Sequence, residues 1–323
     1  MSGPARPVLR QALPALLLAL LLVPLSCTRS EEAKRVDFSR VRPVPRPATA
    51  PSPAKSLRVA VGAMISPQQT FHHYRELLTY LGDKLNRQIH LVQRKTYGEI
   101  NKLLGRGEID LAFICSGPYA AGNKLYNLEL LAAPEVQGRH FYYSYLIVNA
   151  QSPYRSLADL RGRVFAFTDP ESNTGKIVPT FWLALLGQRP ETFFAQVIYT
   201  HGHDNSIMAV ARGLVDGAAV DGLIWDFYHR IDPSFTAKTR IIKRSEPFGI
   251  PPVVASHYLP LQLKQAIRQV LLTMHQDPQG RKILSGLLID RFVPAQDQWY
   301  DSVRHMLSKL ESQRGQAHVA AQP

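Results

Sequence analysis

The sequence predicts an α/β fold with mostly parallel sheets, and three observations lead to this prediction. Short apolar strands alternate with amphipathic helices from residue 57 onward. One helix–glycine–strand segment occurs twice in similar form. The chain has 323 residues, of which 45% are hydrophobic and 20% charged, enough to bury cores for about two domains. This composition excludes a disordered chain, a polytopic membrane protein and a small disulfide scaffold.

The first half of the predicted fold begins with an apolar, β-branched strand that ends at Gly62. Apolar residues then follow at helical spacing from Tyr74 to Leu85. We expect the remaining elements of this half to be strands at 89–92, 110–114 and 142–148 and a short helix at 99–104.

The second half repeats the alternation. Its helices are recognised by apolar residues three and four positions apart, such as Ile207, Val210 and Ala211. The expected elements of this half are strands at 164–167, 197–199 and 218–220 and helices at 207–214, 267–274 and 299–310.

The repeated segment reads Arg-Gly-Glu-Ile-Asp-Leu-Ala at 106–112 and Arg-Gly-Leu-Val-Asp-Gly-Ala at 212–218. Each copy ends a helix, turns on a glycine and enters a short apolar strand. This similarity is either a coincidence of a common turn or a sign of two similar lobes. In open α/β sheets, ligands bind beyond the carboxyl ends of the strands. Two facing lobes would therefore place Ser116 and Asp221 on opposite walls of one cleft.

The N-terminal region is predicted to be a targeting segment. Residues 1–55 carry nine basic and three acidic side chains, so +6 of the net charge of +13 lies there. This uneven charge favours a targeting segment over nucleic-acid binding. An apolar run at 12–25 follows two arginines and is too short to span a bilayer comfortably. We expect a signal peptide at 1–26, lipidation of Cys27 in a segment that resembles a bacterial lipobox, and a Pro-rich tether at 27–56. An ordinary signal with an unmodified Cys27 is the alternative.

The most informative segment is Ser172-Asn173-Thr174-Gly175, at the predicted start of a helix. The first three residues offer small polar side chains, and the glycine allows close approach to the backbone. Free N–H groups and the helix dipole favour an anion at such a place. Ordinary N-capping by Ser172 or Thr174 is the alternative. A Walker A loop is excluded because its first glycine is missing and Ile177 replaces the magnesium-binding Ser or Thr.

Several residues are candidates for metal-binding or catalytic roles. His201 and His203 have a spacing suited to zinc, but the sequence offers no spaced third ligand, so we expect no metal. His203 is interpreted instead as a hydrogen-bond donor that points into the cleft. Ser172, His203 and Asp221 are also the residue types of a hydrolase triad, although no Gly-x-Ser-x-Gly elbow is present. Asp221 is either a helix N-cap or a carboxylate that faces the ligand.

Five motifs occur in order along the chain. They are Tyr-Tyr-Ser-Tyr-Leu-Ile-Val at 142–148, Ser-Leu-Ala-Asp-Leu-Arg-Gly at 156–162, Ser-Asn-Thr-Gly at 172–175, Gly-His-Asp at 202–204 and Val-Asp-Gly-Ala-Ala-Val-Asp at 215–221. Together they resemble the phosphate/phosphite/phosphonate substrate-binding proteins of ABC transporters, over most of the chain. The resemblance implies a two-lobed, type II periplasmic-binding-protein fold with two crossover hinge strands.

The resemblance also implies a division of the chain. The expected parts are a first lobe of 57–149 and 250–312, a second lobe of 150–249, a frayed tail at 313–323, and crossings between the lobes near 145–149 and 247–255.

Roles for single residues follow from the same resemblance. The expected ligand-binding residues are Ser172, Asn173, Thr174, Gly175, His203 and Asp221 in the second lobe and Tyr97, Tyr119 and Ser116 in the first, with Tyr119 a looser match and Ser116 taken from the repeated segment. Asn173 and Thr174 replace the Thr and Ser of the family's Ser-Thr-Ser signature. Aminoalkylphosphonate binders hold the ligand amine with carboxylates, and only Asp221 matches one of these.

We therefore expect a lipid-anchored binding protein that captures phosphate, phosphite or a phosphonate for the permease of an ABC importer. The lobes would close on the anion, which is bound by helix-start N–H groups and hydroxyls. No cofactor, metal or nucleic acid is expected, and the protein is expected to be a monomer. One alternative is a ligand sensor for a membrane receptor or kinase. Another is a hydrolase of phosphoesters or phosphonates that uses Ser172 as its nucleophile.

Overall fold

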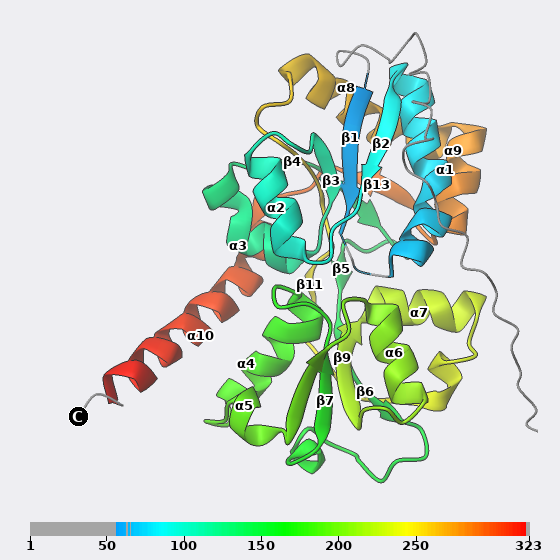
Figure 1. Cartoon of the computed structure of the whole chain (residues 1–323). Coiled ribbons are helices and arrows are strands. Elements are labelled where there is room, and N and C mark those ends of the chain that lie inside the picture. Colours follow the sequence, from blue (N-terminus) through cyan, green and yellow to red (C-terminus); the bar gives the residue numbers. More distant parts are fainter. Residues whose placement is uncertain (1–55, 63, 65, 321–323) are drawn as a thin grey trace, which may run out of the picture. The chain divides into compact units, whose positions relative to one another are not determined.

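The computed structural model describes residues 56–62, 64 and 66–320. The predicted signal peptide, Cys27 and nearly all of the predicted tether lie outside these residues. The described part of the chain forms two α/β lobes, each built on its own sheet, which are joined through two short strands (Figure 1). The predicted α/β fold with two lobes is confirmed.

The first lobe contains a six-stranded sheet in the order β13-β4-β12-β3-β1-β2. Its strands are β1 (Ser56–Val61), β2 (Gln88–Val92), β3 (Leu111–Phe113), β4 (Glu129–Glu135), β12 (Val253–Ala255) and β13 (Arg291–Val293). Its helices are α1 (Pro67–Leu85), α2 (Tyr97–Gly105), α3 (Ser116–Tyr126), α8 (Leu261–Thr273), η6 (Met274–Gln276) and α9 (Pro278–Gly286). The apolar faces of α1 and α8 pack on the sheet, for example through Leu81 and Ile267 against Leu57.

The second lobe contains a five-stranded sheet in the order β10-β6-β9-β7-β8. Its strands are β6 (Ser144–Asn149), β7 (Val164–Phe167), β8 (Gln196–Tyr199), β9 (Gly217–Asp221) and β10 (Thr239–Arg244). Its helices are η3 (Ala158–Leu160), the π-helix η4 (Asn173–Ile177) continuing into α4 (Val178–Ala184), α5 (Pro190–Phe193), α6 (His203–Ala211), α7 (Gly222–Ile231) and η5 (Thr236–Lys238).

Both sheets are mixed, which corrects the expectation of mostly parallel sheets. In the first lobe β1 is parallel to β2 and β3, and in the second lobe β7 is parallel to β8 and β9. Strands β12 and β6 run antiparallel to β3 and β9. The physical reason is the route of the chain. A strand that arrives from the other lobe runs away from the junction, whereas β3 and β9 run toward it.

The connection between the lobes is a two-stranded ladder of β5 (Phe141–Tyr142) and β11 (Phe248–Gly249). The strand predicted at 142–148 is thus broken at Tyr143 into β5 and β6. The expected boundary after residue 149 is too late, since β6 pairs with β9 and β10 in the second sheet.

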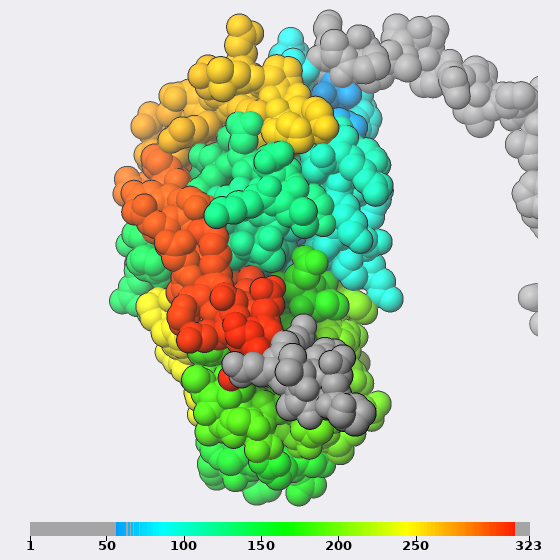
Figure 2. Space-filling view, turned by 90° about the vertical axis from the view of Figure 1, so that its left-hand side faces the viewer, coloured from blue at the N-terminus to red at the C-terminus, as the bar shows by residue number. Residues whose placement is uncertain are grey.

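The C-terminal helix α10 (Asp301–Ala320) follows η7 (Asp297–Tyr300) and packs on the second lobe. Val303 and Met306 are buried in the same apolar cluster as Trp182, and Figure 2 shows the red atoms of α10 against the green atoms of that lobe. The assignment of all of 250–312 to the first lobe is therefore wrong. The expected frayed tail at 313–323 is helical as far as Ala320. Within the described part of the chain, no helix has the length and apolar character needed to cross a bilayer.

The two copies of the repeated segment adopt the same backbone. Helices α2 and α6 end just before Gly107 and Gly213, each of which has φ = +69°, and β3 and β9 follow. Only glycine takes this left-handed conformation without strain. The repeat therefore marks equivalent positions in two similar lobes, with Ser116 beyond the end of one strand and Asp221 at the end of the other.

Candidate functional site

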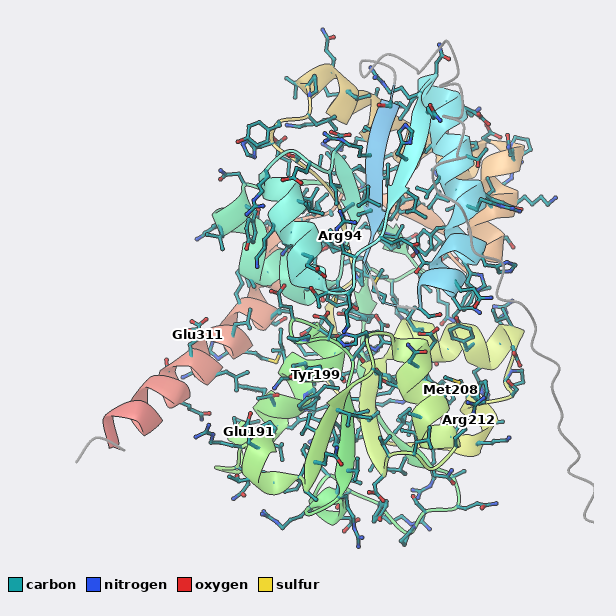
Figure 3. The ribbon with its side chains drawn as sticks, viewed as in Figure 1. Arg94, Glu191, Tyr199, Met208, Arg212 and Glu311 are labelled. Carbon is teal, nitrogen blue, oxygen red and sulfur yellow. The ribbon has the colours of Figure 1, made fainter. Side chains whose placement is uncertain are left out.

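The carboxyl ends of β1, β3, β7 and β9 lie at the junction between the lobes, where side chains from both lobes are densely packed (Figure 3). One hydrogen bond and one close backbone contact show that the two lobes touch here. The N–H of His203 donates to the carbonyl oxygen of Met64 over 2.8 Å. A Cβ atom added at Gly117 would lie 2.2 Å from the carbonyl oxygen of Glu171, so only glycine permits this approach.

The helix start at residues 172–177 is capped by its first residue. Ser172 has extended backbone angles, and its Oγ accepts the N–H of Gly175 over 3.0 Å. The first turn is a π-turn, in which the N–H of Ile177 donates to the carbonyl of Ser172. Lys176 donates to Thr180 and lies over the ring of Phe167. The N-cap alternative is thus correct for Ser172, and it leaves the hydroxyl hydrogen of this residue free to donate elsewhere.

Three polar atoms at the junction are buried and have no hydrogen-bond partner among the described residues: Oδ1 of Asn173, Oγ1 of Thr174 and the hydroxyl of Tyr97. These side chains are 0%, 0% and 2% exposed. Cys115 contacts residues of both lobes. It packs against Tyr97 of the first lobe, and its sulfur accepts the backbone N–H of Asn173 of the second. An unpaired buried polar group costs about 1–3 kcal/mol, and such groups are rare in folded proteins. Three such atoms at the junction therefore need a partner from outside the described residues, such as water or a ligand.

His203 presents one hydrogen-bond donor to the same region. Its Nδ1 lies 3.0 Å from the backbone N–H of Asp221, which can only donate, so the ring hydrogen is on Nε2. Thr168 Oγ1 lies 3.1 Å from Nδ1, and Ser172 Oγ lies 3.5 Å from Nε2. Complete burial lowers the pKa of His203 to about 3, so the imidazole is neutral.

Asp221 caps helix α7 from the end of β9. Its Oδ1 accepts the N–H of Leu223 over 2.8 Å. Burial raises the pKa of this carboxyl to about 7, against the opposing effect of the N–H groups of Leu223 and Ile224. The N-cap interpretation of Asp221 is confirmed, because one oxygen caps the helix, and its role as a carboxylate that faces a ligand stays a prediction.

Tyr142 of β5 forms hydrogen bonds with residues of both lobes. Its hydroxyl lies 2.5 Å from Ser116 Oγ in the first lobe and accepts the amide N–H of Asn173 in the second over 3.2 Å. Cys115 Sγ is 3.9 Å away. Burial holds the pKa of Tyr142 well above its usual value, so the phenol stays neutral. The sequence marked Tyr142 only as part of a strand, and no local signal distinguishes it from a core tyrosine.

Tyr119 makes its contacts away from the polar residues described above. Its hydroxyl donates to Asp297 over 2.7 Å, and its ring packs edge-on against Tyr300 at 4.5 Å between centroids. The sequence could not reveal this contact, because Asp297 is 178 positions away, and a ligand-binding role for Tyr119 stays a prediction that this contact does not support. In the residues that the structure describes, no group of three or more His, Cys, Asp or Glu side chains is arranged to hold a metal.

A model of the family described as "ABC transporter, phosphonate, periplasmic substrate-binding protein" matches residues 59–300. The chain belongs to this family. The motifs and their order had given the same family from the sequence.

Two curated proteins are similar to this binding protein. The "Phosphate-import protein PhnD" of Mycolicibacterium smegmatis is 29% identical over 165 residues, 47% of this chain and 50% of that protein. The "Phosphonates-binding periplasmic protein" of Escherichia coli is 23% identical over 246 residues, 75% of this chain and 72% of that protein. The match thus spans only half the length of the first relative.

Solved structures share the fold of this binding protein. A binding-protein component of an ABC phosphonate transporter from Pseudomonas aeruginosa gives a TM-score of 0.75 at 20% identity, over 79% of this chain and 86% of that one. PhnD1 of Prochlorococcus marinus, in complex with methylphosphonate, gives 0.72 at 17% identity, over 80% of this chain and 98% of that one.

Proposed function

We propose that this binding protein captures a small phosphorus oxyanion between its lobes and delivers it to the permease of an ABC importer. The observation that supports this most is the set of buried polar atoms with no partner among the described residues, from Asn173 and Thr174 at a helix start of the second lobe and from Tyr97 in the first lobe. Such groups need partners, and an oxyanion bound between the lobes would supply acceptors for the hydroxyls among them. The helix start beside them favours a negative charge.

The oxyanion would be bound by neutral donors. Ser172 and Thr174 each have a hydroxyl hydrogen to give, and His203 gives the hydrogen on Nε2. Rotation of the Asn173 amide would let its oxygen accept the hydroxyl of Tyr142 and turn its NH₂ group toward the anion. Hydrogen bonds to a charged acceptor contribute about 1.5–3 kcal/mol each, so a few of them give tight binding.

Asp221 would select the protonation state of the bound anion. A carboxyl with a pKa near 7 holds its proton for about half of the time at neutral pH and can share it with an anionic oxygen. A carboxylate can instead accept the proton of a P–OH group. In both arrangements one proton lies between Asp221 and the anion, which disfavours a fully deprotonated ligand beside a deprotonated carboxyl.

Catalysis is not part of the proposal. A hydrolase would need Nε2 of His203 to accept the hydroxyl proton of Ser172. That nitrogen carries the ring hydrogen instead, since Nδ1 faces the N–H of Asp221. The low pKa of the imidazole also makes it a poor base at neutral pH. We therefore infer binding without turnover.

Membrane anchoring and the state of assembly belong to the same proposal. We expect Cys27 to carry a lipid that holds the protein at the membrane, and the protein to act as a monomer that meets its permease. A ligand sensor for a receptor or kinase would use the same site. Uptake of the ligand by cells separates transport from sensing. Loss of uptake when the gene for this chain is deleted supports transport, and unchanged uptake supports sensing.

The direct test is calorimetric titration of the purified protein with phosphate, phosphite, methylphosphonate, 2-aminoethylphosphonate, sulfate and nitrate. We expect saturable binding of at least one phosphorus oxyanion and none of nitrate. Binding of sulfate alone, or of no anion in the panel, would refute the proposal. Conversion of a phosphonate or phosphate ester to products would refute the non-enzymatic part of it.

A further inference from the structure

A second contact joins the two lobes at the start of helix α1, beside the proposed oxyanion site. The carboxylate of Asp204, in the first turn of α6, accepts the backbone N–H of Ser66 with both oxygens, at 2.9 and 3.1 Å. The two residues are 138 positions apart and belong to different lobes. The preceding residue, His203, donates its backbone N–H to Met64 in the same segment of the first lobe. Two consecutive residues of α6 thus bind one short segment before α1.

Helix α1 has no negative charge of its own at this end. Its first turn, Pro67-Gln68-Gln69-Thr70, contains no acidic residue, and the side chain of the N-cap residue Ser66 makes no capping hydrogen bond within the described part of the chain. The start of a helix carries a partial positive charge and favours a carboxylate nearby. Asp204 therefore gives α1 a cap that comes from the other lobe.

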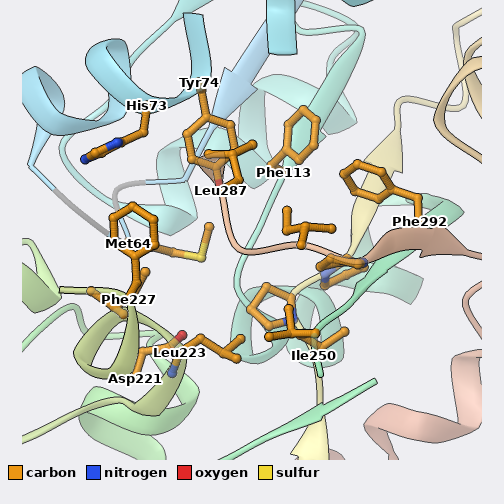
Figure 4. A pocket seen from close by; sticks show the side chains of 16 residues that line it. Met64, His73, Tyr74, Phe113, Asp221, Leu223, Phe227, Ile250, Leu287 and Phe292 are labelled. Atoms are coloured by element: carbon orange, nitrogen blue, oxygen red, sulfur yellow. The ribbon is translucent and has the colours of Figure 1, made fainter. Parts of the chain in front are cut away.

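Aromatic side chains pack across the junction on the same side. The ring of His73 on α1 meets the ring of Phe227 on α7 edge-on, with 5.0 Å between the centroids, and that of Tyr228 with 6.4 Å. Figure 4 shows His73 and Phe227 facing one another from the two lobes. The charge of Asp204 acts on both His73 and Tyr228. The bond between Asp204 and Ser66 is thus part of a larger contact between α1 and the second lobe.

The carboxylate of Asp204 is separate from the donors proposed for the anion. Both of its oxygens bond the N–H of Ser66, whereas the anion is assigned to the hydroxyls of the helix start at 172–174 and to Nε2 of His203. His203 and Asp204 are, however, consecutive residues in one helical turn. An anion that fixes the position of His203 therefore also fixes the position of Asp204 opposite the start of α1.

We propose that Asp204 is a positioning residue for closure, which holds the first lobe over the anion by capping α1. The inference rests on the proposed binding of an anion between the lobes, and it adds a residue that acts on this binding without touching the ligand. The bond forms only when the lobes are together, because its partners lie on different lobes. It stabilises the closed arrangement with or without a ligand, and it slows the departure of a bound anion.

The first test is stopped-flow tryptophan fluorescence of the purified full chain mixed with methylphosphonate. Asp204→Ala removes the acceptor, so the dissociation rate should rise about tenfold while the association rate stays within twofold. The matched control is Asp216→Ala. Asp216 accepts the backbone N–H of Val164 over 2.9 Å and the hydroxyl of Tyr154 over 3.0 Å, both within the second lobe. This control should lower the melting temperature and leave both rates unchanged.

A second variant removes the donor from the first lobe. Ser66 has φ = −56°, a value that proline adopts, so Ser66→Pro removes the N–H with little change in the backbone. It should raise the dissociation rate to a similar extent as Asp204→Ala. In the double variant the two effects should not multiply, because each substitution removes the same bond.

Small-angle scattering gives a readout that needs no ligand. Without an anion, the Asp204→Ala protein should have larger average dimensions than the parent protein, because the lobes separate more often. The Asp216→Ala protein should keep the dimensions of the parent.

The outcomes separate this inference from the proposed function. If the parent binds methylphosphonate, an unchanged dissociation rate in Asp204→Ala, an equal rise in Asp216→Ala, or effects that multiply in the double variant would overturn the inference alone. If the parent binds no anion of the panel, the proposed function is refuted, and scattering then decides the inference. Equal dimensions of the parent and Asp204→Ala would overturn it as well.

Discussion

The two lobes meet at one site but contribute different chemistry to it. The second lobe supplies the helix start with Ser172 and Thr174, and the N–H donor of His203. In the first lobe, Ser116 already bonds Tyr142 of the connection, and the buried hydroxyl of Tyr97 has no partner among the described residues. The same glycine turn thus precedes a strand in each lobe but leads to different roles. The difference indicates that the second lobe binds the anion and that the first lobe closes over it.

The largest expected effect comes from blocking closure at the first lobe. Gly117→Ala should weaken binding of methylphosphonate roughly 100-fold or more, because the new methyl group meets the backbone oxygen of Glu171 at 2.2 Å. Gly98→Ala is the control. Its methyl group would lie 2.6 Å from the end of the flexible Glu171 side chain, which can move aside. Calorimetry on both variants checks this, and equal losses would show that closure at Gly117 is not required.

Substitutions of the hydroxyl residues at the helix start of the second lobe should give the next largest effect. Thr174→Val removes a hydroxyl that has no partner among the residues the structure describes, so affinity should fall about 10- to 100-fold while the melting temperature holds or rises. Ser172→Ala should lose similar affinity and also about 1 kcal/mol of stability, because it removes the N-cap. Titration and thermal unfolding together measure both. Unchanged affinity in Thr174→Val would place the anion elsewhere.

The pH dependence of binding tests Asp221. Burial raises its pKa to about 7, so an anion beside it favours the protonated carboxyl, and affinity should fall about tenfold per unit above pH 7. Asp221→Asn should remove this slope and leave only that of the ligand's own ionisation. Titrations from pH 6 to 9 on both proteins give the comparison. An identical slope in the two would exclude contact between Asp221 and the anion.

Asp221 should also affect stability without ligand. Its folded pKa lies above the unfolded value of about 4, so the folded state holds a proton that the unfolded state releases. The contribution of Asp221 to stability is therefore fully present below about pH 4 and is lost as the pH rises to 7. Denaturant unfolding at pH 5 and 7.5 should show a smaller loss of stability in Asp221→Asn than in the parent protein. An equal loss would contradict the raised pKa.

The smallest expected effects come from the two first-lobe tyrosines. Tyr97→Phe should weaken binding about 3- to 10-fold, since it removes one hydrogen bond to the anion. Tyr119→Phe should leave affinity unchanged and cost about 1 kcal/mol of stability through the lost bond to Asp297. Titration and thermal unfolding of the pair separate the two roles. A larger affinity loss in Tyr119→Phe would reverse the assignment made from the structure.

Local sequence signals predicted the features that depend on neighbouring residues. The helix start at Ser172 and the glycine turns at Gly107 and Gly213 are set by residues within a few positions, and the structure has them. The alternation of strands and helices likewise follows from apolar spacing. The order of motifs gave the family, because several of them had to occur together.

Long-range contacts decided the features that the sequence did not reveal. The hydroxyl of Tyr142 meets Ser116 and Asn173, which are 26 and 31 positions away. The ring hydrogen of His203 is placed by the N–H of Asp221, 18 positions away. The antiparallel entry of β6 and β12 depends on the route of the chain between the lobes. No periodicity within one element carries this information.

The most direct test of the central claim is a crystal structure of the protein with methylphosphonate. We predict that the phosphonate oxygens lie within hydrogen-bonding distance of the hydroxyls of Ser172 and Thr174 and of Nε2 of His203. A phosphonate bound away from this helix start would contradict the account.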